Sequence, residues 1–124
     1  MRDFSDDLAD LRRRLKDARG YLRIDAAKAR LVELEKEASE PSLWDDPDAA
    51  RRVTTELSRV KDDVDLVEGL EGRLSDLETL DEMAREEGDE SLEDEIAGGL
   101  AGLDRDLRPE GKRLERGDER VAPE

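Results

Sequence analysis

Carboxylates are the side chains that could carry chemistry in this sequence. Its 124 residues include 37 Asp and Glu against 22 Lys and Arg, which gives a net charge of -15, and they include no His and no Cys. Catalytic triads built on histidine, cysteine nucleophiles and zinc sites with imidazole or thiolate ligands are therefore excluded. An enzyme would have to work through carboxylates alone, and paired acids do so only when their environments separate their pKa values. We predict that the chain is not an enzyme and has no catalytic residue.

Two acidic clusters could gather a cation. They are Asp45, Asp46 and Asp48, and the run Glu86, Glu87, Asp89 and Glu90. Neither cluster has the alternating ligands, the glycine and the distal Glu of an EF-hand loop. We interpret both as helix-capping and turn residues, so the sequence predicts no metal site and no cofactor.

Two other patterns bear on nucleic acid and phosphate. Gly98-Gly99 lacks the Lys and Ser or Thr that follow the glycine of a phosphate loop. The basic residues that cluster are Arg12, Arg13, Arg14 and Lys16. Basic side chains can neutralise phosphates, but this cluster flanks a leucine stripe in a strongly acidic chain. We expect no sequence-specific nucleic-acid binding, and we interpret the acidic surface as a source of solubility that could also attract basic partners.

Apolar residues spaced by three and four positions predict α-helices up to residue 107. The first stripe contains Leu8, Leu11, Leu15, Ala18 and Leu22. A second helix is expected over about residues 25–39, with Asp25 as its N-cap. Gly20 either kinks or ends the first helix, so the pattern leaves open whether residues 5–39 form one kinked helix or two.

The segment 40–48 separates these helices from the next one. Pro41 stops the preceding helix, and Asp46-Pro47 is typical of an N-cap followed by proline in the first helical turn. Leu43-Trp44 lies within this otherwise acidic loop. We expect the apolar pair to pack back against the helices as a plug.

A very long helix is predicted over about residues 47–86, because apolar residues recur there at helical spacing without an interrupting proline. Gly69 and Gly72 lie inside it, and we interpret them as a bend or a close helix contact. Ser91, with Asp94 three residues later, has the pattern of a capping box at the start of a last helix. That last helix carries Leu92, Ile96, Leu100, Leu103 and Leu107.

Together these elements predict an all-α fold, an antiparallel helical bundle or coiled coil in which shorter helices pack along one very long helix. We expect a helical domain over residues 1–107 and a disordered tail over residues 108–124, since the tail contains prolines, glycines and few large apolar groups. No apolar run approaches the roughly 18 residues that a membrane span needs. Helical stripes that stay exposed would favour self-association.

The order of several short segments resembles a known family. The segments are Arg19-Gly20-Tyr21-Leu22, residues 25–31, Leu34-Glu35, residues 41–47, residues 53–58 and residues 84–90. At this spacing they resemble the N-terminal helical domain of the bacterial peptide chain release factor 2 family, over about residues 5–107. The Leu-Trp-Asp-Asp-Pro loop is fairly specific, and the order of the segments is more specific still.

The resemblance implies a cytoplasmic protein of translation termination. Members of the family read the stop codons UGA and UAA on the ribosome and promote hydrolysis of peptidyl-tRNA, using a Ser-Pro-Phe tripeptide and a Gly-Gly-Gln motif in later domains. Neither motif occurs in this sequence, so no functional residue is carried over. The implied role is docking on the ribosome at the base of the large-subunit stalk. The departure from the family after Leu107 suggests a truncated or frame-shifted copy, or a split gene.

A second function class stays open beside this one. A free-standing acidic helical adaptor or coiled coil would use its long helix to bind partner helices. Ribosome association that survives moderate salt would favour the first class, and absent or salt-sensitive association would favour the adaptor.

Overall fold

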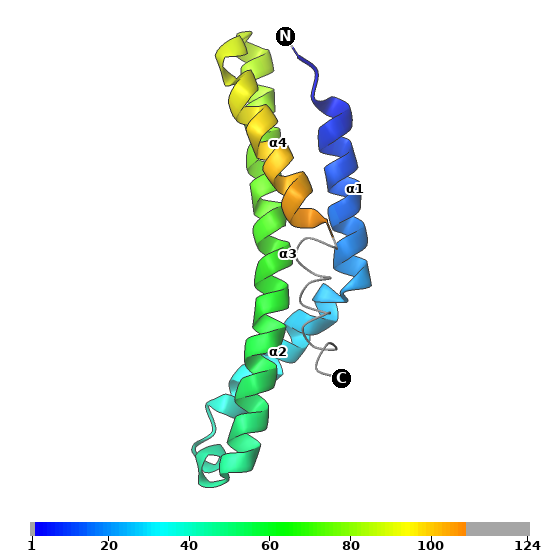
Figure 1. Ribbon diagram of the computed structural model, residues 1–124. Helices are drawn as coiled ribbons and strands as arrows, with labels where there is room; N and C mark the ends of the chain where they lie inside the picture. Colours follow the sequence, from blue (N-terminus) through cyan, green and yellow to red (C-terminus); the bar gives the residue numbers. More distant parts are fainter. Residues whose placement is uncertain (1, 109–124) are drawn as a thin grey trace. The chain divides into compact units, whose positions relative to one another are not determined.

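The computed structural model describes residues 2–108, which form an all-α structure (Figure 1). Within these residues the α-helices are α1 (Ser5–Tyr21), α2 (Ile24–Ala38), α3 (Pro47–Glu87) and α4 (Glu93–Leu107). Two short 3-10 helices, η1 (Pro41–Asp45) and η2 (Glu90–Leu92), precede α3 and α4. Residues 2–108 contain no strand. The predicted fold class is confirmed, whereas the predicted tail lies outside the described residues from position 109 onward.

Two compact units divide the chain. Unit 1 comprises residues 1–16 and 70–124, of which 2–16 and 70–108 are described, and unit 2 comprises residues 17–69. The helices α1 and α3 contribute residues to both units, whereas α2 belongs to unit 2 and α4 to unit 1. Each unit has buried apolar residues of its own.

In unit 1, the beginning of α1 and all of α4 run antiparallel to the later part of α3. The contacts that define these directions are Asp3–Arg85 and Arg12–Glu78 for α1, and Leu77–Gly99 and Arg73–Asp106 for α4. The buried apolar residues are Phe4, Leu8, Leu11, Leu15, Leu70, Leu74, Leu77, Ala84, Ile96, Leu100 and Leu103. The stripes predicted for the first and last helices therefore supply most of this core.

In unit 2, α2 runs antiparallel to the earlier part of α3. The contacts that define the direction are Lys28–Glu68 and Arg30–Glu56. Ile24, Val64 and Val67 form a buried cluster, against which the partly buried Leu22 and Ala27 pack. The other buried apolar residues of this unit are Leu34 and Ala50.

The chain between residues 5 and 39 forms two helices, which answers the question that the sequence left open. It turns at Arg23, whose φ of 54° and ψ of 48° lie in the left-handed region that non-glycine residues rarely adopt. Gly20 lies inside α1. The prediction of Asp25 as N-cap was wrong, because Ala27 N already donates to the Arg23 carbonyl at 2.9 Å and α2 therefore begins earlier.

The start of α3 was predicted correctly. Asp46 Oδ1 accepts hydrogen bonds from Asp48 N at 3.1 Å and from Ala49 N at 3.2 Å. These bonds satisfy amide groups that have no partner within the first turn of a helix. Pro47 is the first residue of the helix, where its missing N–H costs nothing.

The predicted capping box at the start of the last helix was wrong. Ser91 lies inside η2, and the N-cap of η2 is Asp89, whose Oδ1 accepts a hydrogen bond from Ser91 N at 2.9 Å. The residue before Asp89 explains why Asp89, and not Ser91, is the cap. Gly88, with φ of 64°, directs the chain out of α3 so that Asp89 becomes the first capping side chain.

The long helix α3 matches the predicted range closely, but its glycines have a different environment from the one expected. A Cβ atom built on Gly69 or Gly72 would meet nothing within 4 Å. Of the two interpretations, the close helix contact was therefore wrong, and the bend stays a prediction. No helix within residues 2–108, α3 included, combines the length and the apolar character needed to cross a membrane.

Candidate functional site

The predicted basic cluster is paired with carboxylates. It consists of Arg12, Arg13, Arg14 and Lys16. Arg12 donates from Nε to Glu78 Oε2 at 3.3 Å, Arg14 donates from Nη1 to Asp104 Oδ1 at 2.7 Å, and Arg13 pairs with a carboxylate of its own helix. Lys16 is exposed. Because the guanidinium charges are compensated within the protein, the geometry of the cluster does not favour phosphate binding.

A groove of about 250 Å³ lies beside these arginines in unit 1. Arg14 and Asp104 contribute to its polar wall, and Leu11 and Leu100 to its apolar wall. Hydrogen bonds from Arg14, and then from Arg108, hold the pKa of Asp104 below its ordinary value of 3.8. Two charged groups of the polar wall, Arg14 and Asp104, thus pair with each other.

The acidic clusters are used for capping and turning. Besides Asp46, which caps α3, Asp48 pairs with Arg51 at 3.6 Å. In the second cluster, the side-chain hydrogen bond from Ser91 lowers the pKa of Asp89, and the backbone hydrogen bond from the same residue adds to the effect. No group of three or more His, Cys, Asp or Glu within residues 2–108 is arranged to hold a metal ion.

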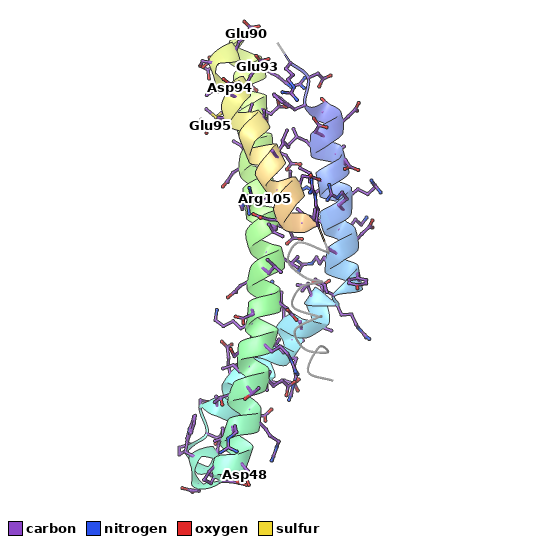
Figure 2. All side chains as sticks on the ribbon, viewed as in Figure 1. Asp48, Glu90, Glu93, Asp94, Glu95 and Arg105 are labelled. Atoms are coloured by element: carbon purple, nitrogen blue, oxygen red, sulfur yellow. The ribbon has the colours of Figure 1, made fainter. Side chains whose placement is uncertain are left out.

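Acidic side chains also gather at the beginning of α4. Figure 2 shows Glu93, Asp94 and Glu95 there, with Glu90 just before them and Arg105 towards the other end of the helix. Carboxylates stabilise the partial positive charge at a helix N-terminus, and a cation stabilises the opposite end. This charge distribution therefore has a structural explanation within α4.

The Gly98-Gly99 pair is part of a helix packing contact and not of a loop. Both residues lie within α4. A Cβ built on Gly99 would lie 2.5 Å from Leu77 Cδ2, whereas one built on Gly98 would meet nothing within 4 Å. Gly99 therefore allows α4 to approach α3 closely.

Trp44 is exposed, although the sequence predicted that it packs against the helices. It lies in η1 and is 55% exposed, although its Nε1 donates to the Ala38 carbonyl at 3.3 Å. Leu43 is half-buried. The expectation of an apolar plug was wrong for Trp44. Besides the last residues of α1, unit 2 has α2 and the earlier part of α3 from which to build a wall around so large a side chain.

Two charged features were not identified from the sequence. Arg30 binds Glu56 through two hydrogen bonds, of 2.8 and 2.9 Å, and these bonds lower the pKa of Glu56. Asp81 is 7% exposed; its Oδ2 accepts a hydrogen bond from Arg85 Nε at 3.0 Å, and its Oδ1 is buried without a hydrogen-bond partner. Helical spacing could have revealed Asp81, since it follows Leu77 by four residues on the buried face.

Comparison with known sequences gives one family. The sequence model of the PCRF domain matches residues 27–117. The match covers most of the chain, including most of α2 and all of α3 and α4.

Curated proteins named peptide chain release factor 2 are similar to this chain. The chain is 41% identical to peptide chain release factor 2 of Streptomyces avermitilis over 87 residues, which are 70% of this chain and 24% of the relative. It is 35% identical to peptide chain release factor 2 of Chloroflexus aggregans over 105 residues, which are 85% of this chain and 29% of the relative. It is 40% identical to the protein of the same name from Mycolicibacterium smegmatis over 101 residues, which are 82% of this chain and 27% of the relative. The chain thus spans less than a third of the length of these relatives.

Proposed function

Since this chain belongs to the PCRF domain family, we propose that it serves translation termination as the N-terminal helical domain of a peptide chain release factor 2. The observation that carries the proposal is the match of this family over residues 27–117. The relatives that share 35–41% identity with it in Streptomyces and Chloroflexus are peptide chain release factor 2 proteins. The activity of such a whole protein is stop-codon-dependent release of the peptide at UGA and UAA.

In this proposal the chain itself is not catalytic. Its sequence offers no imidazole and no thiol. Among the clustered carboxylates, Asp46 and Asp89 serve as caps and Asp48 as an ion-pair partner. What unit 1 and unit 2 offer instead is helical surface, so the role of the chain is docking.

The proposed partner is the ribosome in the cytoplasm, at the base of the large-subunit stalk. The contacts seen in the basic cluster support docking through protein and not through sequence-specific nucleic-acid recognition, because Arg12 and Arg14 are held by Glu78 and Asp104. A net charge of -15 also opposes approach to phosphate groups.

Two assays test this function. In a reconstituted release assay with a stop codon in the ribosomal A site, the chain alone should release no peptide, while full-length peptide chain release factor 2 serves as the positive control. In co-sedimentation with 70S ribosomes, the chain should pellet at moderate salt and should be displaced by the full-length factor. Stop-codon-dependent release by the chain alone would contradict the non-catalytic role, and failure to pellet would contradict the docking role.

A free-standing acidic adaptor is the second candidate function. The observation that favours it is the exposure of large apolar residues in unit 2, among them Tyr21, Val32 and Trp44. Surfaces of this kind would bind a partner helix or a second copy of the chain. Sedimentation equilibrium of the purified chain measures self-association, and the charge of -15 predicts that any dimer strengthens as salt is added.

A further inference from the structure

Trp44 is exposed although its position is well defined. Tryptophan is usually among the highly buried side chains, yet 55% of this residue remains accessible. Its Nε1 is held by the Ala38 carbonyl, and the backbone of η1 is closed by hydrogen bonds from Leu43 N to the Glu40 carbonyl and from Asp46 N to the Leu43 carbonyl, each 3.1 Å. The indole is therefore presented in a fixed place.

Prolines reinforce this arrangement on both sides of the tryptophan. Pro41 is the first residue of η1, and Pro47 is the first residue of α3. Proline limits the conformations of the segment before any partner arrives. An aromatic group that is already ordered loses little conformational entropy on binding, which is the property of residues that dominate protein interfaces.

The charge around Trp44 indicates what kind of partner would fit. The segment 40–48, which we call the Trp44 loop, contains four acidic residues and no basic residue. The acidic residues are Glu40, Asp45, Asp46 and Asp48, and all four are exposed. Asp46 caps α3 and Asp48 pairs with Arg51, so Glu40 and Asp45 are the carboxylates with no such structural task.

We propose that the Trp44 loop is a docking surface for a basic protein segment, whose Arg or Lys side chains stack on the indole and pair with Glu40 and Asp45. A guanidinium or ammonium group is attracted both to the face of an indole and to a carboxylate beside it. Nucleic acid does not fit, because its phosphates would meet carboxylates. A second copy does not fit either, because it brings the same acidic loop and a further charge of -15.

This inference rests on the proposed function, for which it names the contacting surface. The test is co-sedimentation with 70S ribosomes of the unchanged chain, of Trp44→Ala and of Asp45→Lys. Both substitutions are at exposed positions, and helicity of each variant is checked by circular dichroism. The matched control is Tyr21→Ala, which removes an aromatic residue of unit 2 that is 81% exposed and lies outside the loop.

We expect the Kd to rise about tenfold or more for Trp44→Ala, and the Kd of Asp45→Lys to rise by as much or more. The Kd of Tyr21→Ala should change by less than about twofold, because Tyr21 forms no part of the proposed contact. Protein-free ribosomal RNA, used as a second probe, should not bind the chain.

Equal binding of the unchanged chain and the Trp44→Ala variant would overturn the inference and leave the ribosome proposal standing. Binding to protein-free ribosomal RNA that depends on Trp44 would overturn the choice of a basic protein segment. If the unchanged chain does not pellet at all, the ribosome proposal is refuted and this inference falls with it.

Discussion

Unit 1 and unit 2 are built from the same kind of helix but bury very different amounts of apolar surface. In unit 1, apolar residues of α1, α3 and α4 are buried, together with Phe4 just before α1. Unit 2 has the cluster of Ile24, Val64 and Val67, together with Leu34 and Ala50. The exposed aromatic residues among residues 2–108 belong to unit 2.

The difference follows from the number of helical segments in each unit. Three long segments can surround a leucine stripe on several sides, whereas two long segments, as in unit 2, leave part of each stripe facing water. Unit 2 compensates in part with ion pairs between α2 and α3, such as Arg30–Glu56 and Lys28–Glu68. The side chains of these pairs stay accessible to water, so the pairs contribute little to stability. Unit 1 is therefore the better scaffold, and unit 2 offers the more accessible surface.

The largest expected effect compares one buried leucine from each unit. Leu74 and Leu34 are both fully buried. Leu74→Ala should lower the free energy of unfolding by about 4 kcal/mol, because three long segments build unit 1. Leu34→Ala should lower it by about 2 kcal/mol, because the two long segments of unit 2 can close over the space more easily. Urea denaturation followed by circular dichroism measures both.

Val32→Ala is the control for this pair, since Val32 is 63% exposed and its truncation should change stability by less than about 0.5 kcal/mol. A loss at Leu34 as large as that at Leu74 would mean that the core of unit 2 is as well enclosed as that of unit 1.

A smaller effect is expected from the adjacent glycines of α4. Gly98→Ala should stabilise the protein by up to about 1 kcal/mol, because alanine is the better helix former and the added methyl meets nothing within 4 Å. Gly99→Ala should destabilise it by about 1 kcal/mol, because the methyl would overlap Leu77. The change in melting temperature of each variant gives the sign, and two stabilising substitutions would show that the core of unit 1 is loose at Leu77.

The smallest effect is a pH dependence of the ion pair in unit 2. The hydrogen bonds from Arg30 lower the pKa of Glu56 from its ordinary value of 4.5. A carboxylate with a lowered folded pKa stabilises the protein above its unfolded pKa, and this contribution disappears as the pH falls through the folded value. The difference in stability between the unchanged chain and Glu56→Gln should therefore be constant near neutral pH and should shrink below about pH 4.5.

Asp104→Asn supplies the same comparison in unit 1, where Arg14 and then Arg108 lower the pKa of Asp104 below 3.8. Its stability difference should persist to lower pH than that of Glu56→Gln. Parallel unfolding curves measured from pH 7 to pH 3 test both pairs, and differences that grow as the pH falls would contradict the assigned sign.

The sequence predicted the helices well because each carries an apolar stripe many residues long. The helix ends depended on shorter signals, and these competed with one another. Asp25 and Ser91 both have the side chains of an N-cap, but the backbone at Arg23 and Gly88 had already turned before them. Gly20 pointed to a kink or a break between the two helices, but a left-handed arginine leaves no pattern in a single sequence, so the position of the break at Arg23 was not predictable.

The sequence predicted one property of the Trp44 loop and missed another. The sequence identified Trp44 as an unusual residue in an acidic loop, but the expectation that it packs inward assumed a wall that unit 2 does not have. Exposure depends on how many helices surround a position, which is a tertiary property. The pairing of Arg12 and Arg14 with Glu78 and Asp104 is likewise tertiary, because each pair joins residues far apart in the sequence.

The placement of the single tryptophan gives the molecule a convenient optical property. Trp44 is the only tryptophan in the chain and lies in unit 2, so its fluorescence emission reports the state of that unit. The far-ultraviolet ellipticity, in contrast, sums over α1 to α4 and is weighted by both units. Emission and ellipticity recorded on one sample during unfolding therefore distinguish a single cooperative transition from two, and this requires no added label.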